Sequence, residues 1–201
     1  MDHARKCQQN LPEGPSSYYI VGSLGNGATS NGFHALDSEG KEVALKVYVK
    51  HTNANGTVMS KEKFEKVAEA SVNREAENFN SIYNDLKAEE VKLSGIGRWC
   101  VVMPFFRPIE KAKRRGNLEK IQEALRKLEV TGLKYRDDDV RWRHVGLYKE
   151  SCILFDLADL EKVRPDDTSF VKGHHDVLEN RIEKEPVAEE KLFKIETPTK
   201  P

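Results

Sequence analysis

The stretch DDDVRWRHVGLYKESCILFDLA, residues 137–158, combines an acidic turn with a hairpin. Three consecutive aspartates end at Asp139, and two short apolar runs, VGLY and CILF, flank the turn residues KES. Asp156 directly follows the second run, where a carboxylate is costly unless it has a partner. An acidic turn is usually solvated, so Asp139 alone indicates little. Asp156 behind the hairpin therefore points to a functional site whose kind depends on the rest of the chain.

A glycine-rich hairpin lies upstream. GSLGNGATSNG, residues 22–32, separates the apolar strand candidates YYIVGSL and EVALKVYV. Glycines let backbone N–H groups approach phosphate oxygens closely, whereas the plain alternative is a wide turn. Lys46 stands inside the second strand, where a lone ammonium is costly unless it faces solvent on a strand edge. The loop and the lysine together favour a phosphate site over a simple hairpin.

The segments between these two regions predict a small set of regular elements. Residues 60–86 predict a helix with Ser60 as its N-cap, and residues 99–105 predict a strand that Pro104 and Pro108 end. A second helix is expected in NLEKIQEALRKLEVTGL, residues 117–133. Helical spacing gives the two helices apolar stripes: Phe64, Val67, Ala68, Ser71, Val72, Ala76, Phe79 and Tyr83, and then Leu118, Ile121, Ala124, Leu125 and Leu128.

Bulk properties narrow the class of protein. The 201 residues carry 33 Lys and Arg against 33 Asp and Glu, and this zero net charge argues against a general nucleic-acid or membrane-surface binder. No apolar run is long enough to cross a bilayer or to form a signal peptide, so we expect an intracellular, cytoplasmic or nuclear protein. The basic run KAKRRG, residues 111–116, is expected to be solvated. Cys100 and Cys152 are expected to be buried, reduced thiols.

The order of these features resembles that of the protein kinase family, from Tyr18 to Leu160. The resemblance implies an α+β, two-lobed fold with a small antiparallel-sheet N-lobe and a truncated, mainly helical C-lobe. The N-lobe would span 17–106 and the C-lobe 107–183, because only 45 residues follow Asp156. A flexible N-terminal arm over 1–16 and a charged tail over 184–201, with a short helix at 188–194, complete the expected organisation.

The resemblance also assigns the nucleotide-binding residues. The kinase glycine loop has the form G-x-G-x-x-G-x-V, and here Gly25 and Gly27 match, with Ser30 at the third glycine. The motif VALK resembles the kinase VAIK, so Ala44 would line the pocket and Lys46 would hold the α- and β-phosphates. The strand CVVMPFF resembles the one that leads to the hinge between lobes. It would place Met103 behind the adenine, and Pro104, Phe105 and Phe106 would form the hinge.

The catalytic residues implied by the resemblance lie on the first helix and in residues 137–158. Glu75, four residues before Phe79, would position Lys46, with Glu77 as the alternative. Asp139 would accept the hydroxyl proton, and the following positions fall in the catalytic-loop order. In that order Arg141 would meet the γ-phosphate, His144 would take the place of the metal-binding Asn, and Asp156 would bind magnesium.

Departures from the kinase motifs leave more than one function open. Asp137 and Asp138 replace the His and Arg of H-R-D, and Leu157 and Ala158 replace Phe and Gly after Asp156. His144 replaces an Asn, and imidazole is a poor magnesium ligand. The resemblance implies ATP and magnesium as cofactors, phosphoryl transfer to a protein, and a protein substrate or partner. A nucleotide-binding pseudokinase that acts as an interaction module is the main alternative, and a small-molecule kinase is a weaker one.

Two of the altered motifs narrow the resemblance further. RWRHVGL and MPFF resemble the kinase-like domains of crinkler-type effectors from oomycetes and fungi. Membership of that group would imply an effector fragment that works inside a host cell.

Overall fold

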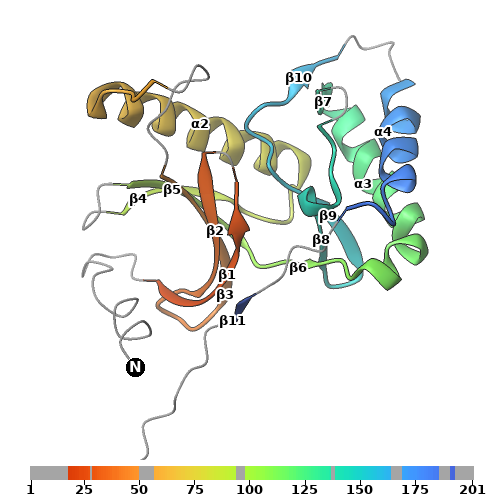
Figure 1. Ribbon diagram of the computed structural model, residues 1–201, viewed down its shortest axis with the longest axis horizontal. Coiled ribbons are helices and arrows are strands. Elements are labelled where there is room, and N and C mark those ends of the chain that lie inside the picture. The colour runs from red at the N-terminus through yellow and green to blue at the C-terminus, as the bar shows by residue number, and fades with distance from the viewer. Residues whose placement is uncertain are drawn as a thin grey trace, which may run out of the picture.

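The computed structural model describes residues 18–27, 29–49, 57–93, 98–136, 139–163, 169–185 and 191–192 (Figure 1). The predicted arm over 1–16 lies outside the described residues. A six-stranded antiparallel sheet has the order β11-β1-β2-β3-β5-β4. Its strands, in chain order, are β1 (Tyr19–Asn26), β2 (Ser30–Leu36), β3 (Glu42–Tyr48), β4 (Glu89–Leu93), β5 (Arg98–Pro104) and β11 (Lys191–Leu192).

The second half of the described chain is mainly helical, with short strands. Its helices, α3 (Leu118–Val130) and α4 (Ser169–Asn180), pack on each other. The first half contains one long helix, α2 (Lys61–Ile82), between β3 and β4. Short 3₁₀ turns occupy Lys111–Lys113, Arg115–Asn117 and Trp142–His144. The small strands are β6 (Arg107–Pro108), β8 (Val145–Tyr148) and β9 (Ser151–Leu154) in one sheet, and β7 (Leu133–Lys134) with β10 (Glu161–Lys162) in another. The predicted α+β class is confirmed.

Helix α2 begins where the sequence predicts. The Ser60 hydroxyl accepts a hydrogen bond from Lys63 N at 3.3 Å, as expected of an N-cap. Most of the predicted apolar stripe is buried along the helix and packs on β5. Ser71 is half-buried, and Val67 is 46% exposed and so was assigned wrongly. The error follows from helix geometry, because Val67 lies at the edge of the stripe that faces the sheet.

Strand β3 carries the lysine toward α2 because side chains alternate along a strand. Val43, Leu45 and Val47 belong to a buried cluster on one face of the sheet. Ala44 and Lys46 alternate with them and therefore lie on the opposite face, where they point toward α2 and the second half of the chain. The strand pattern therefore fixes the direction of Lys46.

One hydrophobic core joins both halves of the described chain. It contains Phe79 of α2 and Tyr83, the C-cap of α2, together with buried residues of β5, α3, β9 and α4. Tyr83 Oη accepts a hydrogen bond from Leu154 N at 2.7 Å, and Asn78 Nδ2 donates to Leu157 O at 2.7 Å. Helix α2 is therefore bonded directly to the segment around Asp156.

The basic run 111–116 contains an unexpected buried cation. Arg114 is 1% exposed, which contradicts the expectation of a solvated run. Its Nη1 donates to Ile182 O at 3.1 Å and to Glu185 O at 2.7 Å, and its guanidinium lies over the Trp142 ring at 5.0 Å. Carbonyl oxygens and an aromatic face offset the cost of burying the charge. Ile182 and Glu185 lie 68 and 71 residues away in the sequence, so the residues around Arg114 gave no signal of these partners.

The short helix expected at 188–194 is wrong for the two residues described there. Lys191 and Leu192 pair antiparallel with Ser23 and Gly22 of β1. A strand forms because the edge of β1 offers unpaired backbone groups, which a neighbouring extended segment can satisfy. The pairing places β11 beside the sheet edge that leads into the glycine loop (Figure 1).

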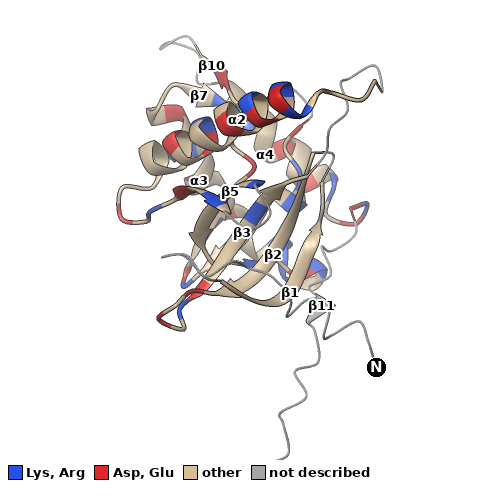
Figure 2. Cartoon of the chain, turned by 90° about the vertical axis from the view of Figure 1, so that its left-hand side faces the viewer, with Lys and Arg blue, Asp and Glu red and all other residues tan. Residues whose placement is uncertain are grey.

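Charged residues of both signs alternate along α2, as Figure 2 shows. This mixture accords with the zero net charge of the chain. In the part of the chain that the structure describes, no helix has both the length and the apolar character needed to span a bilayer.

Cys100 and Cys152 are buried free thiols, as the sequence predicts. Burial raises the pKa of Cys100 to about 12 and that of Cys152 to about 11.

Because the thiolate is the reactive form, we expect neither thiol to be alkylated by iodoacetamide at neutral pH until urea unfolds the protein. Unfolded thiols ionise near pH 8.5, so stability falls as the pH rises above about that value. Peptide mass spectrometry measures the labelling, and rapid labelling of either thiol in the folded protein would contradict its burial.

Two glycines give opposite predictions for alanine. A Cβ at Gly146 would lie 2.8 Å from Phe106 Cδ2 and 3.3 Å from Arg107 O, so Gly146→Ala is expected to cost about 1–3 kcal/mol. A Cβ at Gly173 meets no heavy atom within 4 Å, and Gly173 lies inside α4, so Gly173→Ala is expected to stabilise by about 0.5–1 kcal/mol. Urea unfolding measures both. Equal stabilities of the two variants would contradict the packing at Gly146.

Candidate functional site

A cleft of about 490 Å³ lies between the glycine-rich hairpin and the hairpin β8–β9. Residues from both halves of the chain line it: Leu24, Gly25, Gly27, Ser30, Gly32, Ala44, Leu45, Lys46, Met103, Phe106, Pro108, Arg141, Arg143, His144, Phe155, Asp156 and Glu185. Most of the residues that the sequence assigns to a nucleotide site are therefore brought together. Glu75 lies just beneath the lining, where its carboxylate reaches Lys46.

Lys46 joins two carboxylates from distant parts of the chain. Its Nζ lies 2.9 Å from Glu75 Oε1 and 2.8 Å from Glu75 Oε2, and it also bonds Asp156 Oδ1. Glu75 is 0% exposed, and its carboxylate further accepts hydrogen bonds from Tyr48 Oη and Leu157 N, each at 3.3 Å. Of the two sequence alternatives for the partner of Lys46, Glu75 makes this contact, whereas Glu77 is exposed.

Lys46 and Asp156 each favour the charged form of the other. Burial acts to lower the pKa of Lys46, but the adjacent Glu75 and Asp156 carboxylates outweigh it and raise that pKa above its ordinary value. Burial acts to raise the pKa of Asp156, yet the Lys46 ammonium and His144 bring it below its ordinary value. The Lys46 ammonium therefore lies between two carboxylates from separate segments, an arrangement that suits a site that also receives a cation.

The glycine loop covers one wall of the cleft. Gly27 N donates to Ser30 O at 2.7 Å, and Gly25 has φ of 115°, a left-handed conformation that favours glycine. A Cβ at Gly32 would lie 3.3 Å from Leu24 Cβ, so strand β2 approaches β1 closely there. Ser30, which stands at the third glycine of the kinase pattern, is buried and lines the cleft.

His144 and Asp156 face each other at the far wall. His144 Nε2 lies 3.2 Å from Asp156 Oδ2, and Arg143 Nε lies 3.1 Å from the same ring nitrogen. Burial lowers the pKa of His144 to about 4, with Asp156 opposing and Arg143 reinforcing the change, so the imidazole is neutral near pH 7. Asp156 has φ of 64°, an uncommon conformation for a non-glycine residue that turns its carboxylate out of the strand direction.

Apart from Glu75, three assigned residues, Pro104, Phe105 and Asp139, do not line the cleft. Asp139 is exposed and is not among the lining residues, although its backbone N–H donates to Arg136 O at 3.0 Å. The Phe105 ring stacks on His34, with centroids 3.7 Å apart, and is not a lining residue either. Ala44 and Met103, which the sequence assigns to the adenine end, do line the cleft.

Two charged residues that line the cleft, Arg143 and Glu185, were not predicted from the sequence. Arg143 lies between the assigned Arg141 and His144 and is exposed. In the sequence it is one of two arginines in this short run, and nothing marks it out from Arg141. Glu185 lies in the segment expected to be a tail, and its Oε2 accepts a hydrogen bond from Trp142 N at 2.9 Å. Its Oε1 also lies 3.8 Å from Arg141 Nη1, so Glu185 supports the loop that carries Arg141 and His144. Only tertiary packing brings it there, 43 residues from Trp142.

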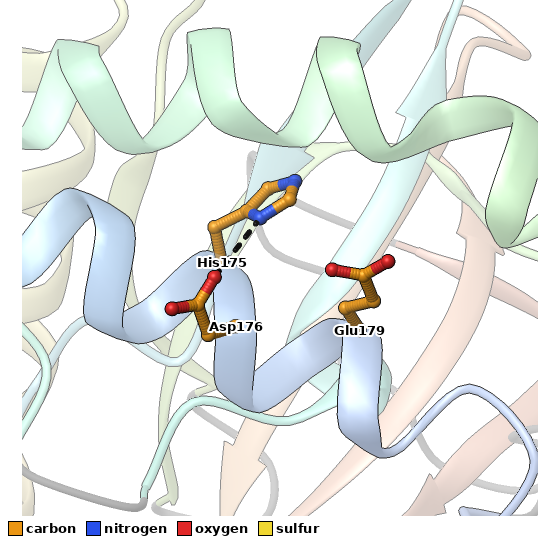
Figure 3. A group of neighbouring side chains, drawn as sticks. All are labelled: His175, Asp176 and Glu179. Atoms are coloured by element: carbon orange, nitrogen blue, oxygen red, sulfur yellow. Dashed lines mark ion pairs between the residues drawn. The ribbon is translucent and has the colours of Figure 1, made fainter.

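A second group of potential metal ligands lies on α4, outside the cleft. His175, Asp176 and Glu179 place one ligand atom each within 4.8 Å of one another, and Figure 3 shows Glu179 one helical turn beyond the His175–Asp176 pair. His175 Nδ1 lies 3.7 Å from Asp176 Oδ1, and both carboxylates are exposed. Exposed acidic groups are common without a metal, and this group serves below as a control.

The buried lysine–glutamate pair beneath a glycine loop, on this α+β scaffold, is the arrangement of a kinase-like fold. Among solved structures, the chain is similar to the Rio2 kinase–ADP/Mg²⁺–phosphoaspartate complex from Chaetomium thermophilum, with a TM-score of 0.52 and 13% sequence identity. The match covers 90% of this chain and 57% of the other, so the chain spans little more than half of that protein's length. The kinase-like fold predicted from the sequence is confirmed.

The sequence comparisons define the family. The family model of DUF5898, a family of unknown function, matches residues 23–148, and the chain belongs to this family. A comparison with curated protein sequences finds no match.

Proposed function

We propose that the chain binds ATP in the cleft and transfers its γ-phosphoryl group to a protein hydroxyl. The observation that carries the proposal is the contact of Lys46 with both Glu75 and Asp156 beside the glycine loop. A buried lysine needs one carboxylate for neutrality, not two from separate segments, whereas a phosphate site needs a fixed cation next to a metal-binding acid.

Each residue has a role that its position supports. The glycine loop at Gly25 and Gly27, together with Ser30, would lie against the phosphates, and Lys46 would hold the α- and β-phosphates while Glu75 fixes its ammonium. Arg141, which lines the cleft, would meet the γ-phosphate, and Glu185 would keep it oriented. Ala44 and Met103 would contact the adenine, and the Phe105 backbone would bond its edge. Asp139 would accept the hydroxyl proton from a substrate that approaches from the exposed side.

A divalent cation would neutralise the phosphate charge during transfer. Asp156 offers the carboxylate oxygen that magnesium favours. His144, which stands beside it, offers a ring nitrogen that magnesium takes poorly. The donors present therefore fit magnesium at Asp156 and do not fit it at His144.

A thermal-shift titration with ATP tests nucleotide binding, with and without divalent cation. Wild type is expected to be stabilised, and Lys46→Ala is expected to show no ATP-dependent shift. Radiolabelled ATP then tests transfer, and we expect autophosphorylation in wild type but not in Lys46→Ala or Asp156→Ala. Equal label in all three proteins would contradict the site, and a wild type that no nucleotide stabilises would remove nucleotide binding altogether.

A pseudokinase is the second candidate, and the position of Asp139 favours it. The carboxylate that would accept the hydroxyl proton is exposed and does not line the cleft. Such a protein would bind nucleotide and a protein partner without transferring phosphate. ATP-dependent stabilisation that needs Lys46, with no label incorporated into the protein or into added test proteins, would identify this function. The crinkler-type effector resemblance stays a prediction.

A further inference from the structure

We propose that the cation site of this cleft selects a first-row transition metal, represented here by Mn²⁺, over Mg²⁺, because His144 supplies a nitrogen ligand beside Asp156. The inference rests on the nucleotide site proposed above and names the cation that it uses. It concerns two side chains that come from different ends of the hairpin β8–β9 and meet at the wall of the cleft.

The separation of the two donor atoms suits one shared cation. His144 Nε2 and Asp156 Oδ2 lie 3.2 Å apart. Two ligand atoms each about 2.1 Å from one metal, at angles between a right angle and the tetrahedral angle, lie about 3.0–3.4 Å apart. The pair therefore needs little rearrangement to hold an ion together.

The hydrogen bonding of His144 leaves its ring nitrogen with conflicting neighbours. Arg143 Nε approaches Nε2 as a donor, and Asp156 Oδ2 approaches the same nitrogen as an acceptor. A neutral ring nitrogen either donates or accepts, so it satisfies only one of them. When Nε2 carries no proton, it and Asp156 Oδ2 are two electron-rich atoms 3.2 Å apart, and a cation bound to both, in place of the Arg143 N–H, removes their repulsion. The exposed Arg143 side chain can turn away to admit the ion.

The burial of the two groups differs in a way that fixes one and leaves the other accessible. The His144 side chain is 4% exposed, whereas that of Asp156 is 44% exposed. The imidazole is held by packing near Tyr135 and Phe155, so its Nε2 points in one direction, while Asp156 can adjust to the ion. A fixed nitrogen ligand disfavours magnesium, which prefers an all-oxygen octahedral shell, and favours ions that accept imidazole.

Competition between the two cations tests the selectivity. Free Mn²⁺ is followed by its electron paramagnetic resonance signal while Mg²⁺ displaces it from the full chain loaded with a non-hydrolysable ATP analogue. We expect wild type to need at least about tenfold more Mg²⁺ than the free analogue needs, since even an outer-shell change at a metal site costs at least that factor. His144→Asn is expected to return the ratio to that of the free analogue. An equal ratio in wild type and His144→Asn would overturn the inference.

Pulsed electron paramagnetic resonance of bound Mn²⁺, on protein whose histidines are labelled with nitrogen-15, tests directly whether a histidine is a metal ligand. Bound Mn²⁺ is expected to show coupling to a labelled imidazole in wild type and in the control His175→Asn. Absence of this coupling in wild type, or its loss in His175→Asn, would overturn the inference. The wild-type measurement decides the matter even where His144→Asn fails to fold.

The same samples separate this inference from the proposed function. Nucleotide binding that is equally strong with either cation, without histidine coupling, would leave the proposed function standing and remove the selectivity. Titration of Mn²⁺ without nucleotide tests the His144–Asp156 pair when nucleotide does not bind. In that case histidine coupling supports the metal site, and its absence overturns it.

Discussion

Replacing Lys46 with methionine is expected to lower the free energy of unfolding by about 3–5 kcal/mol and to abolish stabilisation by ATP. Glu75 is fully buried, and Lys46 is the cation that compensates its charge. The substitution leaves that carboxylate with only Tyr48 Oη and Leu157 N as partners. Urea unfolding with and without ATP measures both effects.

Two further variants separate the lost ion pair from lost volume. Lys46→Met combined with Glu75→Gln removes both charges, so we expect it to recover much of the stability but none of the ATP response. Lys87→Met makes the same substitution at an exposed pair, where Lys87 Nζ lies 2.7 Å from Glu89 Oε1, and is expected to change neither property. A double variant less stable than Lys46→Met would contradict the view that an uncompensated Glu75 causes the loss.

Arg114→Met is expected to cost about 3 kcal/mol or more. Methionine keeps much of the side-chain volume but removes the charged donor from two carbonyl oxygens, Ile182 O and Glu185 O. Hydrogen bonds from charged groups contribute about 1.5–3 kcal/mol each, and buried oxygens without partners add a penalty. Because Glu185 also accepts from Trp142 N, we further expect the Trp142 amide to exchange its hydrogen faster in this variant.

The neighbouring Arg115 provides the matched control. Arg115 is exposed, so Arg115→Met changes the same chemical group in the same short segment without removing a buried contact. Unfolding in urea and hydrogen exchange are expected to match wild type. Similar losses in Arg114→Met and Arg115→Met would show that the net charge of the segment matters, rather than the buried bonds of Arg114.

Much of the fold was predictable because its elements carry local signals. The apolar, β-branched strand EVALKVYV and the helical stripe of α2 each depend on residues close in sequence, and Ser60 marked the start of the helix. The order of motifs that resembles the kinase family, rather than periodicity, assigned Lys46, Glu75 and Asp156, and the structure places Lys46 in contact with both carboxylates. Periodicity predicts only which side of an element faces the core.

The remaining features depend on contacts that periodicity does not encode. In the sequence Arg114 is one of several basic residues in a short run. It is buried because it contacts Trp142, Ile182 and Glu185. Glu185 and β11 lie in a segment whose composition predicts a tail, yet Glu185 reaches the cleft and β11 pairs with β1. Such positions become visible only when distant segments are placed together.

The shared hydrophobic core has a consequence for dividing the chain. A cut after Phe106 would separate Phe79 and Tyr83 from the α3, β9 and α4 residues against which they pack, and would remove the Leu154 N–H that bonds Tyr83. Each fragment would present half of one apolar interface, so we expect neither half to fold on its own. The two polypeptides would instead behave as a split protein, with the cleft assembled by fragment complementation.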